Sequence, residues 1–301
     1  ALRAPVAALR AARRARPIVR RADVVLGMGG YVSVPASLAA RSEGVPLILH
    51  EQNAVPGLAN RVAARWARAV AVSFDETVGR FGGRGVMTGN PVRAAIVRSR
   101  EDRASLAAEA RSALGLLEGR RTILVLGGSQ GALRLNRAAV ELCSLLAERS
   151  DLQMVVLTGR RQFEDVRRAL PRPRGVAVTT APFIDRIELA YAAADIAVSR
   201  AGASAIAELT VSGVPAILVP YPYATGGHQQ ANARAVARAG GAEVVLDDAA
   251  DGGELGRRLT GLLDDRERLS DMAAASRRFG RPEAAETVAG LAASVARERT
   301  R

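Results

Sequence analysis

The stretch TILVLGGSQGA, from Thr122 to Ala132, decides the fold of this chain. An apolar run from Ile123 to Leu126 leads into a glycine-rich loop, and apolar residues at helical spacing follow as far as Leu145. This order predicts a buried strand, a loop and a helix. Glycines let the backbone approach a phosphate closely, and the free amides at a helix start favour a diphosphate. The loop therefore indicates an anion site, with a tight turn that needs glycine only for packing as the alternative.

The sequence excludes a P-loop and disfavours a plain dinucleotide-binding loop. All 43 basic residues are arginine, so neither a P-loop lysine nor a Schiff-base lysine is present. The glycine spacing also departs from G-x-G-x-x-G, which disfavours a plain dinucleotide site. A formal net charge of +13 favours anionic partners such as nucleotide phosphates, nucleic acid or an acidic membrane surface, without choosing among them.

Short apolar runs recur on both sides of this stretch, each followed by a helical pattern. Such runs are typical of buried parallel strands, and their alternation with helices predicts an α/β fold in two halves. A polar helical stretch from Ser99 to about Leu114 separates the halves and places a boundary near residues 91–98. The first half has runs at 23–27, 46–50, 69–73 and 85–88, and the second at 122–127, 153–158, 176–180, 195–199, 215–219 and 242–246.

Two more loops of the second half could bind a ligand. The run 195–199 leads into a helix that carries Glu208 about one turn inside. A carboxylate there can accept hydrogen bonds from a vicinal diol such as a ribose, or it can simply stabilise the helix dipole by roughly 0.3–1 kcal/mol. The run 215–220 leads into a loop rich in Gly and Pro, and Gln229 and Asn232 follow it at a spacing that lets both amides bind sugar hydroxyls.

The few residues that commonly bind metals are scattered. His50 and His228 are the only histidines and Cys143 is the only cysteine, so the chain has no internal disulfide and no paired ligand spacing. Asp247 and Asp248 are typical of a loop. We expect no metal and no cofactor. Each histidine lies in one of the polar loops, where a hydrogen-bonding surface residue is the simplest interpretation.

Five motifs, in order along nearly the whole chain, resemble those of the MurG family of bacterial glycosyltransferases. The resemblance implies a GT-B architecture, in which two Rossmann-like domains with parallel sheets face each other across a cleft. It assigns residues 1–93 to an acceptor and membrane-side domain, 94–280 to a domain that binds UDP-N-acetylglucosamine (UDP-GlcNAc), and 281–301 to a C-terminal helix that packs back on the first domain. The motifs are DVVLGMGGYVSV (23–34), HEQN (50–53), GNPVR (89–93), GGSQGA (127–132) and GHQQANA (227–233).

The resemblance also implies roles for individual residues. Ser129 would contact the diphosphate, the backbone of Ile184 the uracil, and Glu208 the ribose hydroxyls. Gln229 and Asn53 would bind the hydroxyls of N-acetylglucosamine (GlcNAc). Arg93 would lie near the nucleotide, and the start of the helix would offer amides at Ala203, Ser204, Ala205, Ile206 and Ala207.

One family feature has no counterpart here. The family has a Gly-rich loop with a His after its first strand, and we interpret the chain as truncated ahead of Ala1, with low turnover as the expectation. The reaction inverts the anomeric centre, so a base must help deprotonate the acceptor C4 hydroxyl. His50 is then the candidate base, with Glu51 in reserve.

The implied function is transfer of GlcNAc from UDP-GlcNAc to undecaprenyl-diphosphate-MurNAc-pentapeptide in peptidoglycan synthesis. Another GT-B transferase that acts on a lipid, or a nucleotide-sugar-binding remnant, are the alternatives. A nucleic-acid binder is disfavoured because the arginines are scattered and aromatic residues make up only 3% of the chain.

The resemblance implies a peripheral protein at the cytoplasmic face of the cell membrane, and the sequence contains neither an 18-residue apolar run nor the apolar core of a signal peptide. An anionic membrane surface is the expected contact for two basic helical segments. The first, 2–21, interleaves seven arginines with Leu2, Val6, Leu9, Ile18 and Val19; the second combines Arg61, Arg65 and Arg68 with Leu58, Val62 and Trp66. The alternative is that these apolar residues pack on the sheet.

Overall fold

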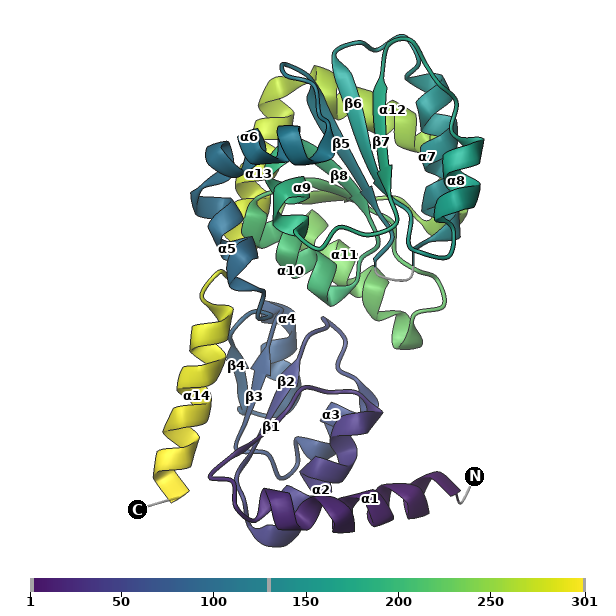
Figure 1. Ribbon diagram of the computed structural model, residues 1–301. Helices are drawn as coiled ribbons and strands as arrows, with labels where there is room; N and C mark the ends of the chain where they lie inside the picture. The colour runs from purple at the N-terminus through teal and green to yellow at the C-terminus, as the bar shows by residue number, and fades with distance from the viewer. Residues whose placement is uncertain (1–2, 129–130, 300–301) are drawn as a thin grey trace. The chain divides into compact units, whose positions relative to one another are not determined.

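The computed structural model describes residues 3–128 and 131–299, and the chain divides into two compact units (Figure 1). Unit 1 comprises Ala1–Pro91 together with Glu283–Arg301, and unit 2 comprises Val92–Pro282. Each unit contains one parallel sheet with helices packed against it.

Unit 1 is built on a four-stranded sheet in the order β1-β2-β3-β4, with every pair parallel. The strands are β1 (Val25–Gly27), β2 (Leu47–Glu51), β3 (Ala69–Val72) and β4 (Gly85–Met87). The helices are α1 (Arg3–Val19), α2 (Val34–Glu43), α3 (Leu58–Ala63), α4 (Asp75–Val78) and α14 (Ala284–Arg299), with short 3-10 turns η1 (Tyr31–Ser33) and η2 (Gly79–Phe81).

The core of unit 1 lies between the sheet and its helices. Leu47 and Leu49 of β2 are two residues apart and point to the same face, where they pack with the small side chains of α2 and α3. Val19 at the end of α1 belongs to this core and is 6% exposed. Arg16 of α1 and Arg20, just after its end, both form salt bridges with Glu43 at the end of α2.

Unit 2 has a six-stranded parallel sheet in the order β10-β9-β8-β5-β6-β7. The strands are β5 (Arg121–Leu126), β6 (Leu152–Leu157), β7 (Ala177–Ala181), β8 (Ile196–Ser199), β9 (Ala216–Leu218) and β10 (Ala242–Val244). The helices are α5 (Ala94–Glu101), α6 (Arg103–Leu114), α7 (Leu133–Leu145), α8 (Phe163–Ala169), α9 (Ile187–Ala193), α10 (Ala203–Ser212), α11 (His228–Arg238), α12 (Gly252–Asp264) and α13 (Arg266–Phe279), with turns η3 (Thr225–Gly227) and η4 (Asp247–Ala249).

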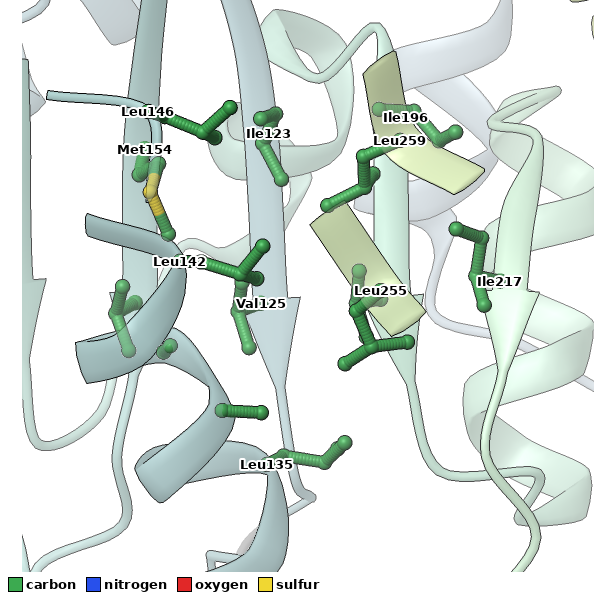
Figure 2. Close-up of a cluster of buried hydrophobic side chains, with 14 of the residues drawn as sticks. Ile123, Val125, Leu135, Leu142, Leu146, Met154, Ile196, Ile217, Leu255 and Leu259 are labelled. Atoms are coloured by element: carbon green, nitrogen blue, oxygen red, sulfur yellow. The ribbon is translucent and has the colours of Figure 1, made fainter. Parts of the chain in front are cut away.

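A cluster of buried apolar side chains covers one face of this sheet (Figure 2). Leu135 and Leu142 from α7 and Leu255 and Leu259 from α12 lie over strand residues such as Val125. All five are at most 1% exposed, so the strand that carries the glycine-rich loop is anchored by close packing.

The structure confirms the prediction of an α/β fold with two parallel sheets, because each predicted apolar run overlaps a strand. The polar stretch after residue 93 forms α5 and α6. Within the described ranges, no helix is long and apolar enough to cross a membrane.

Candidate functional site

The sheet of unit 2 has a switch point between β5 and β8. From β5 the chain continues to β6 and β7 on one side, whereas β8, β9 and β10 lie on the other. In open α/β sheets such a point leaves a crevice at the carboxyl ends of the two strands, where ligands bind. Leu126 of β5 pairs with Ser199 of β8, so the loops that follow both strands leave the sheet side by side.

The glycine-rich loop after β5 combines packing constraints with an open position. A Cβ at Gly127 would lie 2.4 Å from the Ala132 nitrogen, and one at Gly131, whose φ is +74°, would lie 2.3 Å from the Thr158 oxygen. Packing therefore requires glycine at these two positions, in agreement with a tight turn between strand and helix. Gly128 has φ +81° and its Cβ would meet no described atom within 4 Å. Ser129, the predicted diphosphate contact, lies outside the described residues.

The start of α10 presents backbone donors beside this loop. Gly202 caps the helix, and none of the described side chains bonds to its cap. The Ile206 amide already donates to the Gly202 carbonyl at 2.9 Å, whereas the amides ahead of it, from Ala203 to Ala205, have no backbone partner among residues 3–128 and 131–299. Of the five residues whose amides were predicted to bind the ligand, Ile206 already uses its amide in a hydrogen bond within the first turn of α10.

Glu208 lies half-buried on α10 and has a buried partner. The hydroxyl of Tyr191, from α9, donates to Glu208 Oε2 at 2.9 Å, and Tyr191 is 1% exposed. Burial raises the pKa of the Glu208 carboxyl, whereas the hydrogen bond from Tyr191 and the charge of Arg93 lower it. No sequence pattern marks Tyr191 as a site residue, because it lies in an apolar helical stretch.

Arg93 and Ile184 come together although they are far apart in the sequence. Arg93 Nη1 donates to the carbonyl of Asp185 at 3.3 Å, and the half-buried Ile184 is the preceding residue. The Arg93 charge also lowers the pKa of Glu208 and that of Tyr191. Arg93, Glu208 and Tyr191 therefore form one electrostatic group.

The loop that precedes α11 is fixed against the end of β8. Arg200 Nη1 donates to the Val219 carbonyl at 3.2 Å and forms a salt bridge with Asp247. Gln229 Oε1 accepts a hydrogen bond from the Tyr221 amide at 2.9 Å, and Asn232 Nδ2 donates to the Ala201 carbonyl at 3.3 Å. The amide group of Gln229 is thereby oriented at the start of α11, while Asn232 joins α11 to the start of α10.

The candidate residues of unit 1 follow β2. His50 is 0% exposed, and its Nε2 lies 3.0 Å from the Gly89 carbonyl oxygen. Burial lowers the pKa of His50, and its Nδ1 has no hydrogen-bond partner among the described residues. In this conformation the ring does not reach the surface, so its role as general base stays a prediction.

Glu51 is the centre of the HEQN loop. Its carboxylate accepts hydrogen bonds from the backbone and side chain of Asn53 at 3.1 and 3.3 Å, from the Gly57 amide at 2.9 Å, and from Asn60 Nδ2 at 2.8 Å. Glu51 is 2% exposed, so this arrangement holds Asn53 in place instead of presenting a base. Gly57 and Asn60 were not predicted; they became visible only through these contacts.

Comparison with known proteins agrees with both units. The glycosyltransferase family 28 C-terminal domain matches residues 122–288, and the N-terminal domain of the same family matches residues 1–72. A UDP-N-acetylglucosamine–N-acetylmuramyl-(pentapeptide) pyrophosphoryl-undecaprenol N-acetylglucosamine transferase from Halothermothrix orenii is 40% identical over 92% of this chain and 76% of its own length. A protein of the same name from a Nocardioides species is 44% identical over 89% of this chain and 72% of its own length.

Solved structures show the same architecture. MurG of Acinetobacter baumannii has a TM-score of 0.76 and 29% identity, covering 96% of this chain and 77% of that chain. A UDP-GlcNAc 2-epimerase from Neisseria meningitidis bound to UDP-GlcNAc has a TM-score of 0.70 at 14% identity, over 94% of this chain and 80% of that chain, which shows a shared fold only.

Two Rossmann-like units and matches to both family domains define a GT-B glycosyltransferase of family 28. Within that class, the chain belongs to the MurG family.

Proposed function

We propose that the chain transfers GlcNAc from UDP-GlcNAc to undecaprenyl-diphosphate-MurNAc-pentapeptide, the reaction named in its relatives. The observation that carries the proposal is Glu208, held by Tyr191 beside the free amides of α10 at the switch point of unit 2. A carboxylate and unpaired amides side by side suit a nucleoside diphosphate, since one binds hydroxyls and the other binds phosphate.

On the donor side, each group has a partner in UDP-GlcNAc. The diphosphate would bind the amides of the loop that includes Gly128 and those at the start of α10. Glu208 Oε1 would accept from a ribose hydroxyl, because Oε2 is taken by Tyr191. The uracil would lie against the backbone of Ile184, with Arg93 nearby, and the free amide nitrogen of Gln229 would bind the sugar.

From unit 1, Asn53 of the HEQN loop would bind the GlcNAc hydroxyls, as the family resemblance implies. Glu51 fixes this loop by accepting hydrogen bonds from both ends of it. His50 remains the candidate base: with Nε2 donating to the Gly89 carbonyl, Nδ1 would carry the lone pair, and the role requires this buried nitrogen to become accessible to the acceptor hydroxyl.

The acceptor carries a lipid, so we further propose that unit 1 contacts an anionic membrane surface at the cytoplasmic face. On α1, Val6 and Leu9 are 45% and 57% exposed and stand among exposed arginines. On α3, Leu58 and Val62 are exposed beside Arg61, and an apolar cavity of about 250 Å³ opens between this helix and η1. Apolar side chains bordered by cations suit the boundary between headgroups and acyl chains.

Val19 and Trp66 differ from the exposed residues of these segments. Val19 is buried in the core of unit 1, and Trp66 packs partly against that core with the Arg41 guanidinium 4.9 Å from the centre of its ring. The membrane surface that we propose is therefore smaller than the sequence predicts.

An acceptor comparison tests the function. UDP-GlcNAc is supplied with a soluble lipid I analogue or with diacylglycerol, and labelled lipid products are quantified. Faster labelling of the lipid I analogue supports the proposal. Faster labelling of diacylglycerol favours another lipid glycosyltransferase, and saturable UDP-GlcNAc binding without any product favours a binding remnant.

A further inference from the structure

The hydroxyl of Tyr191 is a buried polar group of unit 2 that contacts Glu208, the proposed ribose-binding residue. Tyr191 is 1% exposed on α9, and its ring is held by the interior of the domain. Its hydroxyl donates to Glu208 Oε2 on α10 at 2.9 Å. A buried hydroxyl usually needs a partner, but here the partner is a carboxylate that is itself only half-buried.

We infer that Tyr191 is a positioning residue that holds the Glu208 carboxylate in the orientation needed to bind the ribose of a uridine nucleotide. This inference rests on the proposed donor site. Tyr191 itself does not touch the nucleotide; it acts through Glu208.

The geometry supports a positioning role for Tyr191 and a ribose-binding role for Glu208. With Oε2 fixed by Tyr191, Oε1 is left as the acceptor for a ribose hydroxyl. A hydrogen bond to an ionised group is roughly twice as strong as a neutral one, so it restrains a flexible side chain effectively. Without it the carboxylate would spend part of its time in other rotamers, and the apparent affinity falls in proportion to the competent fraction.

The electrostatics add a second effect. The Tyr191 hydroxyl is protonated at ordinary pH, as that of an unperturbed tyrosine is, and burial raises its pKa further. Burial also raises the pKa of Glu208, and the hydrogen bond from Tyr191 is the largest influence that opposes this rise, followed by the charge of Arg93. Tyr191 from α9 and Arg93 ahead of α5 are the groups that act on Glu208, and together they favour its ionised form.

The test is UDP binding to Tyr191→Phe by titration calorimetry, alone and in a Glu208→Ala background. Phenylalanine keeps the buried ring and removes only the hydroxyl. We expect about tenfold weaker UDP binding for the single Phe variant. In the Glu208→Ala background the same change should alter affinity by less than about twofold, because its target is gone.

The pH profile gives a readout that a merely structural role would not move. UDP binding should weaken as the pH falls through the Glu208 pKa, and Tyr191→Phe should shift the midpoint of that loss to higher pH. UDP's own phosphate titration is common to both proteins and cancels in the comparison. Thr210→Val is the matched control, since it removes a buried hydroxyl on the same helix that bonds only to backbone carbonyls, at Ile206 and Ala207.

The possible results distinguish a wrong role for Tyr191 from a wrong ribose assignment for Glu208. If Glu208→Ala weakens UDP but Tyr191→Phe changes neither affinity nor midpoint, the inference on Tyr191 is wrong and the donor site stands. An equal loss from Tyr191→Phe in both backgrounds also overturns it, because the tyrosine would then act on the fold. If Glu208→Ala leaves UDP affinity unchanged, the ribose assignment itself fails, and the role of Tyr191 falls with it.

Discussion

Removal of the Glu208 carboxylate should weaken UDP binding in two graded steps. In Glu208→Gln the side chain keeps its shape and its carbonyl can still accept from Tyr191, but the NH2 group then faces the ribose and can only donate a neutral hydrogen bond to a hydroxyl oxygen, in place of the charged acceptor. A charge-assisted hydrogen bond contributes about 1.5–3 kcal/mol and a neutral one about 0.5–1.5 kcal/mol. The difference, about 1–1.5 kcal/mol, corresponds to roughly 5- to 13-fold weaker binding.

Glu208→Ala removes the whole interaction, so UDP should bind about 10- to 150-fold more weakly. This variant also leaves the buried Tyr191 hydroxyl without its partner at 2.9 Å, which should cost about 1–3 kcal/mol of folding stability. Titration calorimetry gives the affinities, and thermal unfolding without ligand gives the stability change. If both variants are folded and bind UDP as tightly as the unchanged chain, Glu208 does not bind ribose and serves only the helix start.

Two other predictions concern the phosphate loop and the membrane. Gly128→Val should weaken UDP much more than uridine in parallel titrations, because Gly128 has φ +81° beside the proposed diphosphate and the change distorts the loop; equal weakening of both ligands would indicate a general folding defect. Co-sedimentation with vesicles should rise with anionic lipid content and fall with salt, since each arginine near such a surface contributes about 1 kcal/mol. The charge reversal of Arg10, Arg13 and Arg14 to Glu should reduce it, and binding that is equal on neutral vesicles or survives this change would refute the membrane surface.

Much of the fold could be predicted from sequence because buried parallel strands are nearly continuous apolar runs. The run from Ile123 to Leu126 is buried on both faces of the sheet, so it carries few polar residues and its position is unambiguous. The strand order could not be read in this way. That β8 lies beside β5 depends on long-range packing, and this adjacency is what brings the two glycine-containing loops side by side.

The residues of the candidate site could be predicted only where a polar residue lies just after a predicted strand or turn. Glu208 stands out because a carboxylate follows a strand and a turn. Tyr191 does not, because one aromatic residue in an apolar helix is indistinguishable from a core residue until its hydroxyl is located. His50 illustrates the reverse: a histidine at a strand end suggests chemistry, yet here its ring is buried and lies against the Gly89 carbonyl.

The most direct test of the central claim is the chemical structure of the product. Purified chain is incubated with UDP-GlcNAc and a lipid I analogue, and the lipid product is analysed by mass spectrometry and by proton NMR of its new glycosidic linkage. We predict one GlcNAc joined through a β-1,4 bond to MurNAc, even if turnover is low, and correspondingly less of the same product from the Glu208→Ala variant at a nucleotide concentration that does not saturate it. An α-linkage, a sugar on a different hydroxyl, or release of free GlcNAc without any lipid product would contradict it.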